Sequence, residues 1–146
     1  MRHIESNAQG AGLRVAVIDT SWNDFIVSRL LEGAVSTLLK HGVADDDITH
    51  IRVAGAFELP IAAKTAAETG RYDAIVALGC VIRGDTAHFD YVAGEAAKGI
   101  AKVGLDTGIP VIFGVLTTDT VEQAMDRAGI KLGNKGAEAA TVAIET

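Results

Sequence analysis

His88 is the side chain best suited to proton transfer, because it lies in the segment GDTAHFDYV, just after Gly84, Asp85 and Thr86. A histidine titrates near neutral pH and can pass protons to a bound substrate. Gly84, Asp85 and Thr86 precede a predicted helix, whose free amide groups could hold a phosphate. Since a lone histidine is usually structural or simply exposed, both interpretations stay open here. Arg83 could neutralise a phosphate or be a solvated surface residue.

Two further loops carry side chains that could bind a ligand. Trp22, the only tryptophan, lies in the polar turn DTSWN and could either stack on a planar ring or pack at a subunit contact. Residues 55–58 read GAFE, which could bring backbone amides and the Glu58 carboxylate to a polyol. Glu58 could equally be a first-turn acid that the helix dipole stabilises.

Arg127, Lys131 and Lys135 form a basic group near the end of a predicted helix. Their spacing suits a helix C-terminus without any ligand, or a site that collects phosphate charge. A planar guanidinium makes paired hydrogen bonds to phosphate oxygens, so Arg127 is the better candidate anchor.

The segments that position these residues alternate between strand and helix. Four short apolar runs predict strands at Leu13–Ile18, Ile48–Val53, Ala74–Leu78 and Val111–Val115, with residues 79–86 as a long loop. Apolar spacing, capping residues and glycines predict helices from Asn23 to Gly42, Ile61 to Thr69, His88 to Thr107, Thr120 to Ala128 and Ala137 to Ile144. This order predicts an α/β fold, with a parallel sheet between helices, and ligands at the carboxyl ends of its strands.

Composition narrows the function classes. The 146 residues suit one domain, and a net charge of −6 with scattered basic residues argues against nucleic acid. Cys80 is the only cysteine, which excludes an internal disulfide and multi-cysteine metal sites and suits a reducing cytosol. We expect a cytoplasmic protein that binds no metal and contacts no membrane. Residues 13–146 should form one domain, and residues 1–12 should form a leader that is disordered or pairs with a neighbouring subunit. The 49% hydrophobic content suggests an oligomer.

Five segments in order resemble the lumazine synthase family over nearly the whole chain from Leu13: GAFELP at 55–60, LGCVIRGDTAHFDYV at 78–92, PVIFGVLTTDT at 110–120, EQAMDRAG at 122–129 and GNKGAEAA at 133–140. The resemblance implies a three-layer α/β/α sandwich with a flavodoxin-like, four-stranded parallel sheet. It also implies homopentamers, or multiples of pentamers, with active sites between subunits. The implied reaction needs no cofactor and condenses 5-amino-6-(D-ribitylamino)uracil with 3,4-dihydroxy-2-butanone 4-phosphate to 6,7-dimethyl-8-ribityllumazine.

The resemblance also implies roles for individual residues. Trp22 would stack on the pyrimidine, Asn23 would assist by hydrogen bonding, and His88 would transfer protons. The pyrimidine and ribityl pocket would be lined by Ala56, Phe57, Glu58, Cys80, Val81 and Ile82, with Phe113 from a neighbouring subunit. Phosphate would be held by Asp85 and Thr86 with the neighbour's Arg127, and more weakly by Lys131 and Lys135.

One departure and two alternatives accompany the resemblance. The family often has phenylalanine where this chain has Trp22, and the larger indole predicts measurable flavin binding. A non-catalytic, flavin-binding paralogue is the first alternative, although it would need neither His88 nor Arg127. A flavodoxin-like redox or nucleotide-binding module is the second, but no G-x-G-x-x-G follows the first strand. Riboflavin synthase is a candidate partner, and assemblies of five, ten or sixty subunits are all compatible with the sequence.

Overall fold

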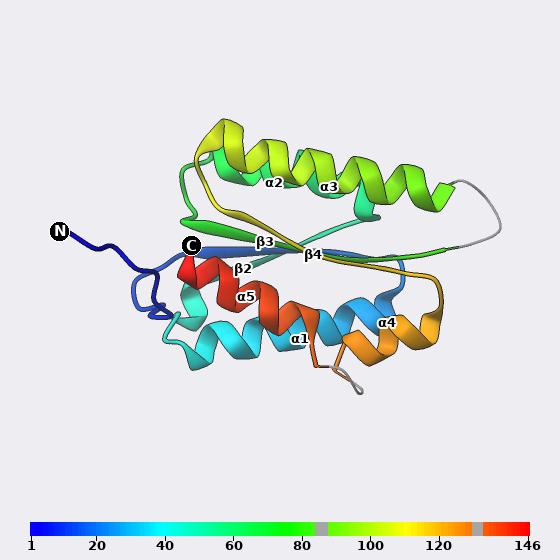
Figure 1. Ribbon diagram of the computed structural model, residues 1–146, viewed down its shortest axis with the longest axis horizontal. Helices are drawn as coiled ribbons and strands as arrows, with labels where there is room; N and C mark the ends of the chain where they lie inside the picture. The colour runs from blue at the N-terminus through cyan, green and yellow to red at the C-terminus, as the bar shows by residue number, and fades with distance from the viewer. Residues whose placement is uncertain (84–87, 130–132) are drawn as a thin grey trace.

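A four-stranded parallel sheet forms the centre of the molecule (Figure 1). The computed structural model describes residues 1–83, 88–129 and 133–146. The strand order is β2-β1-β3-β4. The strands are β1 (Val15–Thr20), β2 (Ile48–Val53), β3 (Ala74–Ile82) and β4 (Val111–Thr118).

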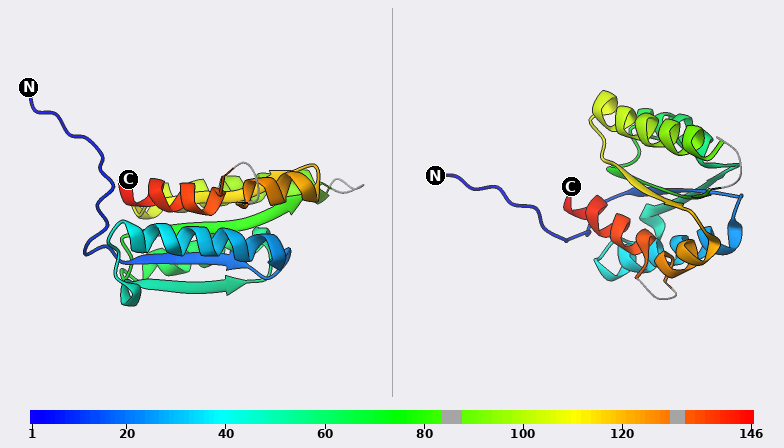
Figure 2. Two further views of the ribbon diagram at one scale, coloured as in Figure 1. Left: turned by 90° about the horizontal axis from the view of Figure 1, so that it is seen from below. Right: turned by 45° about the vertical axis from the view of Figure 1, so that its right-hand side comes forward.

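Helices cover both faces of this sheet, which confirms the predicted three-layer α/β/α sandwich (Figures 1 and 2). One face packs against α1 (Asp24–Lys40), α4 (Val121–Arg127) and α5 (Lys135–Glu145). The other packs against α2 (Leu59–Glu68) and α3 (His88–Thr107). Short 3₁₀ turns, η1 (Asp45–Asp47) and η2 (Ala56–Glu58), stand before β2 and α2.

The central strands are mostly apolar because both of their faces are covered, although β1 ends in the buried polar residues Asp19 and Thr20. In β1, Val15 and Val17 face α1 and α5, whereas Ala16 and Ile18 face α2 and α3, and all four are fully buried. Continuous apolar runs of this kind are typical of parallel strands buried on both sides. The strand ends are therefore held rigidly where their loops begin.

Helix α5 packs closely on α1 because Gly136 has no side chain. A Cβ there would collide with the backbone carbonyl of Leu30. Asn134, which the sequence analysis missed, caps α5 by accepting from Ala137 N at 3.0 Å and also donates to Arg29 O of α1 at 3.0 Å. One asparagine thus both begins α5 and joins it to α1.

The predicted bounds of three strands were wrong. β1 lies at Val15–Thr20, two residues later than the predicted Leu13–Ile18. β3 continues past Leu78 to Ile82, and β4 continues past Val115 to Thr118, so the segment GCVI is strand rather than loop. These extensions pair with each other, ending with Ile82 opposite Thr118. Local composition did not reveal them, because each extension is stabilised by hydrogen bonds to a segment far away in the sequence.

The first residues of the chain extend away from the domain (Figures 1 and 2). Residues 1–9 contain no helix or strand, and the Ile4 side chain is 84% exposed. The backbone joins the domain where Gly10 N donates to His41 O at 2.8 Å. Among the described residues, no helix is both long enough and apolar enough to cross a membrane.

Candidate active site

The loops that follow β1 and β2, the end of β3 and the first turns of α3 meet at the carboxyl end of the sheet and enclose two adjoining cavities. The smaller cavity, about 150 Å³, is lined by Thr20, Trp22, Asn23, Ala56, Cys80, Val81, Ile82, His88 and Val92. The larger, about 320 Å³, is lined by Trp22, Phe57, Glu58, His88, Tyr91 and Val92. Trp22, His88 and Val92 line both cavities, so the two belong to one site at the place where α/β proteins bind ligands.

The Trp22 indole reaches over the loop after β2. Its backbone is held at both ends, since Thr20 Oγ1 donates to Trp22 O at 3.3 Å and Trp22 N donates to Ala54 O at 3.1 Å. A Cβ on Gly55 would lie only 2.7 Å from Trp22 Cζ3, so glycine leaves room for the ring. The indole is 62% exposed and presents an aromatic face to the cavities.

Asn23 adopts a left-handed backbone conformation, with φ 59° and ψ 39°, and no other non-glycine among the described residues has a positive φ. Asparagine tolerates this conformation better than most residues, which pay about 1–2 kcal/mol. The sequence predicted that the Asn23 side chain would cap α1, and this prediction was wrong. Its Nδ2 donates instead to Cys80 O at 2.9 Å. This hydrogen bond stabilises the fold by about 1 kcal/mol, which is similar in size to the cost of the left-handed backbone conformation at Asn23.

Cys80 forms part of the cavity wall and is not poised to react. Only 6% of the residue is exposed. Burial raises the pKa of its thiol from 9.0 to about 11, so the thiol is neutral at pH 7. Because the thiolate is the nucleophilic form, Cys80 supplies shape and an apolar surface rather than covalent chemistry.

Glu58 brings to the larger cavity a carboxylate oxygen that accepts no hydrogen bond from the described residues. Its Oε2 is buried and has no hydrogen-bond partner among the described residues. Buried acceptors of this kind are rare, and an N–H or O–H group of a ligand would satisfy it. Beside it, Phe57 stacks on Tyr91 with ring centroids 6.1 Å apart. Tyr91 was not predicted as a site residue, although it lies three residues after His88 on the same helix face.

His88 is the first residue of α3, and neighbouring side chains tie this end of the helix to the strand ends. Arg83 donates to Asp119 Oδ1 at 2.8 Å and lies 3.6 Å from Asp90 Oδ1. Its guanidinium also lies 4.6 Å from the centre of the Phe89 ring. Arg83 therefore joins the ends of β3 and β4 to the first turn of α3, a role that neither interpretation from the sequence foresaw.

Three residues of the predicted site do not line the two cavities: Phe113, Arg127 and Lys135. Phe113 is half-buried on β4, against the layer formed by α2 and α3. Arg127 is exposed at the end of α4, and Lys135 begins α5 rather than following a helix end. Asp85, Thr86 and Lys131 lie outside the described residues.

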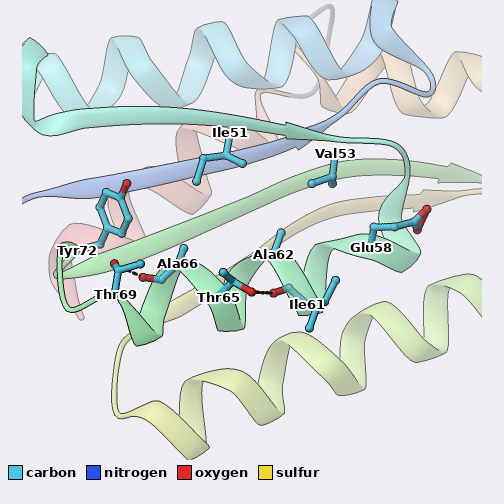
Figure 3. A pocket seen from close by; sticks show the side chains of 9 residues that line it. All are labelled: Ile51, Val53, Glu58, Ile61, Ala62, Thr65, Ala66, Thr69 and Tyr72. Atoms are coloured by element: carbon cyan, nitrogen blue, oxygen red, sulfur yellow. Dashed lines mark hydrogen bonds between the residues drawn. The ribbon is translucent and has the colours of Figure 1, made fainter.

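A third cavity, about 490 Å³, lies between β2 and α2 (Figure 3). It is lined largely by apolar side chains and shares only Glu58 with the two site cavities: Ile51, Val53, Glu58, Ile61, Ala62, Thr65, Ala66, Thr69 and Tyr72. The strand beside it, β2, is at the edge of the sheet. Among the described residues, no group of three or more His, Cys, Asp or Glu side chains could hold a metal ion.

Two comparisons with known proteins agree with this geometry. Residues 12–146 match the family described as 6,7-dimethyl-8-ribityllumazine synthase. The whole chain is similar to a protein of Nitratidesulfovibrio vulgaris with that same name, at 56% identity over 146 residues, which cover 94% of the relative. Both matches include every loop that contributes to the two cavities.

Proposed function

The chain belongs to the 6,7-dimethyl-8-ribityllumazine synthase family, and from this premise we propose that the two cavities are the part of the active site that one subunit supplies. The enzyme is a transferase-type condensing enzyme of riboflavin biosynthesis. It condenses 5-amino-6-(D-ribitylamino)uracil with 3,4-dihydroxy-2-butanone 4-phosphate, releasing 6,7-dimethyl-8-ribityllumazine, phosphate and water.

The convergence of Trp22, Glu58 and His88 on adjoining cavities is the observation that supports this assignment most strongly. The exposed indole suits stacking on the pyrimidine, and the buried Glu58 Oε2 suits a ribityl hydroxyl or a ring N–H. Asn23 directs its amide N–H to Cys80 O, so it contributes by holding the turn that carries Trp22. Ala56, Phe57, Cys80, Val81 and Ile82 complete the wall.

His88 has the position needed for the proton transfers. As the substrate amine attacks the ketone, the nitrogen loses a proton and the former carbonyl oxygen gains protons before leaving as water. A histidine at the border of both cavities can carry out each transfer in turn. Such transfers contribute about 10²–10⁴-fold, whereas holding two partners together supplies up to about 7–11 kcal/mol. His88 therefore accelerates a reaction that proximity already favours.

A neighbouring subunit would complete the site. Arg127 and Phe113 do not line the cavities of their own chain, which supports their contribution to the adjacent subunit. Arg127 would bind phosphate together with Asp85 and Thr86, with Lys131 and Lys135 as weaker contributors. Sites shared in this way require an oligomer; the assembly that we propose is the homopentamer, and larger assemblies would be multiples of that ring.

The surfaces available for assembly include the apolar cavity beside the edge strand β2 and the leader at 1–12 (Figures 2 and 3). An unpaired strand edge accepts another extended chain readily, and Ile4 is exposed on a leader that extends away from its own domain. The leader would pair with a neighbouring subunit, while residues 13–146 form the domain. A cytoplasmic location suits the reduced, buried Cys80, and riboflavin synthase is the proposed partner enzyme.

The assay is direct: purified protein is mixed with both substrates, and lumazine formation is followed by absorbance and fluorescence. Absence of product from the unmodified protein would favour a flavin-binding, non-catalytic protein. Shared sites are tested by co-expressing His88→Ala and Arg127→Ala chains. Activity in the mixed assembly well above that of either pure variant is expected, because some sites then contain both native residues. Activity no higher than that of the pure variants would place Arg127 and His88 in the same subunit's site.

A further inference from the structure

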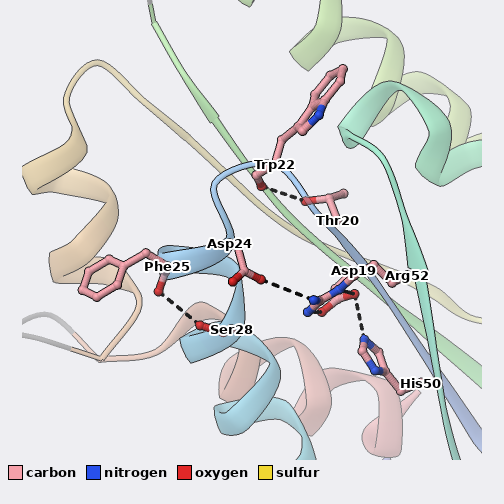
Figure 4. Close-up of polar contacts among 8 residues, drawn as sticks. All are labelled: Asp19, Thr20, Trp22, Asp24, Phe25, Ser28, His50 and Arg52. Atoms are coloured by element: carbon pink, nitrogen blue, oxygen red, sulfur yellow. Dashed lines mark hydrogen bonds and ion pairs between the residues drawn. The ribbon is translucent and has the colours of Figure 1, made fainter.

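A buried carboxylate lies directly behind the turn that carries Trp22. Asp19, near the end of β1, is 0% exposed. Parallel pairing places Arg52 of β2 opposite it, and Arg52 donates to both of its oxygens, at 3.0 and 2.9 Å (Figure 4). His50 Nε2 lies 2.7 Å from Asp19 Oδ1. The carboxylate thus has charged or polar partners on each oxygen, as burial of a charge requires.

The same guanidinium continues to a second carboxylate. Arg52 Nη1 lies 3.3 Å from Oδ1 of Asp24, the first residue of α1. Arg52 therefore links the last part of β1 to the beginning of α1, across the turn at residues 21–23 (Figure 4). The hydrogen bond with Asp19 raises the pKa of Arg52 above its already high value, so the guanidinium is charged throughout the working pH range.

The turn between the two carboxylates, residues 21–23, has a backbone conformation that other contacts must stabilise. Asn23 immediately precedes Asp24 and is in the left-handed conformation, which persists only when surrounding contacts determine it. The bond from Asn23 to Cys80 O holds one side of the turn, and the bond from Thr20 Oγ1 to Trp22 O holds its start. Where the turn enters α1, Asn23 O accepts from Ile26 N and Val27 N at 3.0 Å, and the contact of Arg52 with Asp24 ties this first turn of the helix to strand β2.

We propose that Arg52 is a positioning residue of the active site, whose bridge from Asp19 to Asp24 sets the place of the Trp22–Asn23 turn and so of the pyrimidine-binding surface. The inference rests on the function proposed for Trp22 and Asn23. Arg52 does not line either site cavity, so it acts through the turn and not by contact with substrate.

The test uses substitutions that spare the buried charge. An apolar residue at 52 would leave Asp19 without its paired cation and could unfold the protein. Arg52→Lys keeps the charge but loses the planar fork, so it cannot span both carboxylates. Asp24→Asn breaks only the far end of the bridge. Arg14→Lys is the matched control, since Arg14 is similarly exposed and lies 3.5 Å from Asp73 at the opposite end of the sheet.

Trp22 reports on the turn directly, because it is the only tryptophan. In the full assembled protein, we expect Arg52→Lys and Asp24→Asn to increase iodide quenching of its emission. We also expect both to raise KM for the pyrimidine about fivefold, with KM for the butanone phosphate and kcat changed less than about twofold. Arg14→Lys should leave all of these values as they are in the unmodified protein.

Several results would overturn the proposal. Unchanged quenching and unchanged KM in Arg52→Lys, whether or not its melting temperature falls, would make the bridge merely structural. An effect confined to Asp24→Asn would assign the change to the loss of an acid at the start of α1. If the unmodified protein makes no lumazine, the proposed function fails. The quenching comparison still decides whether Arg52 holds the turn.

Discussion

Asn23 Nδ2 donates to Cys80 O across 2.9 Å, and this bond joins the turn after β1 to the middle strand β3. It replaces the helix-capping contact that an asparagine at this position usually makes. The aromatic face of Trp22 and the cavity wall at Cys80 are thereby held in one arrangement. Two contributions to the free energy of unfolding can be separated at Asn23: the cost of the left-handed backbone conformation and the gain from the hydrogen bond.

Substituting Asn23 separates the two parts. Asn23→Ala removes the bond and places in the left-handed region a residue that disfavours it, so the free energy of unfolding should fall by about 2–3 kcal/mol. Asn23→Gly removes the bond but adopts this backbone readily, so its loss should be about 1 kcal/mol. Urea unfolding measures both. Equal losses would mean that the backbone conformation at residue 23 costs nothing.

Gly55 should be needed for the position of the Trp22 ring. In Gly55→Ala the new Cβ would meet the indole, so the ring must move, with changed tryptophan emission and a several-fold higher KM for the pyrimidine. Gly94→Ala is the control, because a Cβ there meets nothing within 4 Å and alanine favours the helix. An unchanged emission spectrum and an unchanged KM in Gly55→Ala would show that the loop after β2 moves to accommodate the new Cβ and that the indole ring does not.

The raised pKa of Cys80 predicts how stability depends on alkaline pH. Below pH 9.0 the thiol is protonated in both folded and unfolded chains, so it has no effect. Between pH 9.0 and about 11 only the unfolded chain loses the proton, which lowers the free energy of unfolding by roughly 1 kcal/mol per pH unit. Cys80→Ala lacks this titration, so its stability should fall less steeply over that range. Parallel curves for the two proteins would contradict the prediction.

His88→Ala should slow the reaction without abolishing it. Losing one proton-transfer group should reduce kcat by about 10²-fold or more, while the rate that comes from binding both substrates remains. KM for each substrate should change little, because His88 is expected to act in the transition state. Steady-state lumazine formation measures both constants. An unaltered kcat would remove His88 from the assigned role.

Trp22 should give the protein measurable affinity for riboflavin. Its exposed indole offers a large stacking surface at the edge of two cavities. Titration with micromolar riboflavin should quench tryptophan emission, and calorimetry should show weaker binding by Trp22→Phe and much weaker binding by Trp22→Ala. No quenching at these concentrations, or equal affinity in all three proteins, would contradict this prediction.

Much of the fold could be predicted from the sequence, because apolar periodicity is a local property of the chain. Both limits of β2 and the last residue of α3 were predicted correctly, and the alternation of strands and helices was sufficient for the three-layer sandwich. Trp22 and His88 were singled out by their residue types and by their places after strands, and both line the two cavities; their roles in the reaction stay predictions. The segments around them also identified the family, which both comparisons confirm.

Contacts between distant segments were decided only by the tertiary structure. The register of β1 and β2 brings Arg52 to Asp19, and nothing in either strand alone indicates that pairing. Pairing with β4 makes Cys80 a strand residue, and its burial raises the pKa of the thiol. The fold also brings the Cys80 carbonyl to Asn23, 57 positions away in the sequence. Residue types and local periodicity determined which groups are present and in which elements. Chain topology determined which of them meet, because hydrogen bonds and desolvation depend on neighbours in space rather than in sequence.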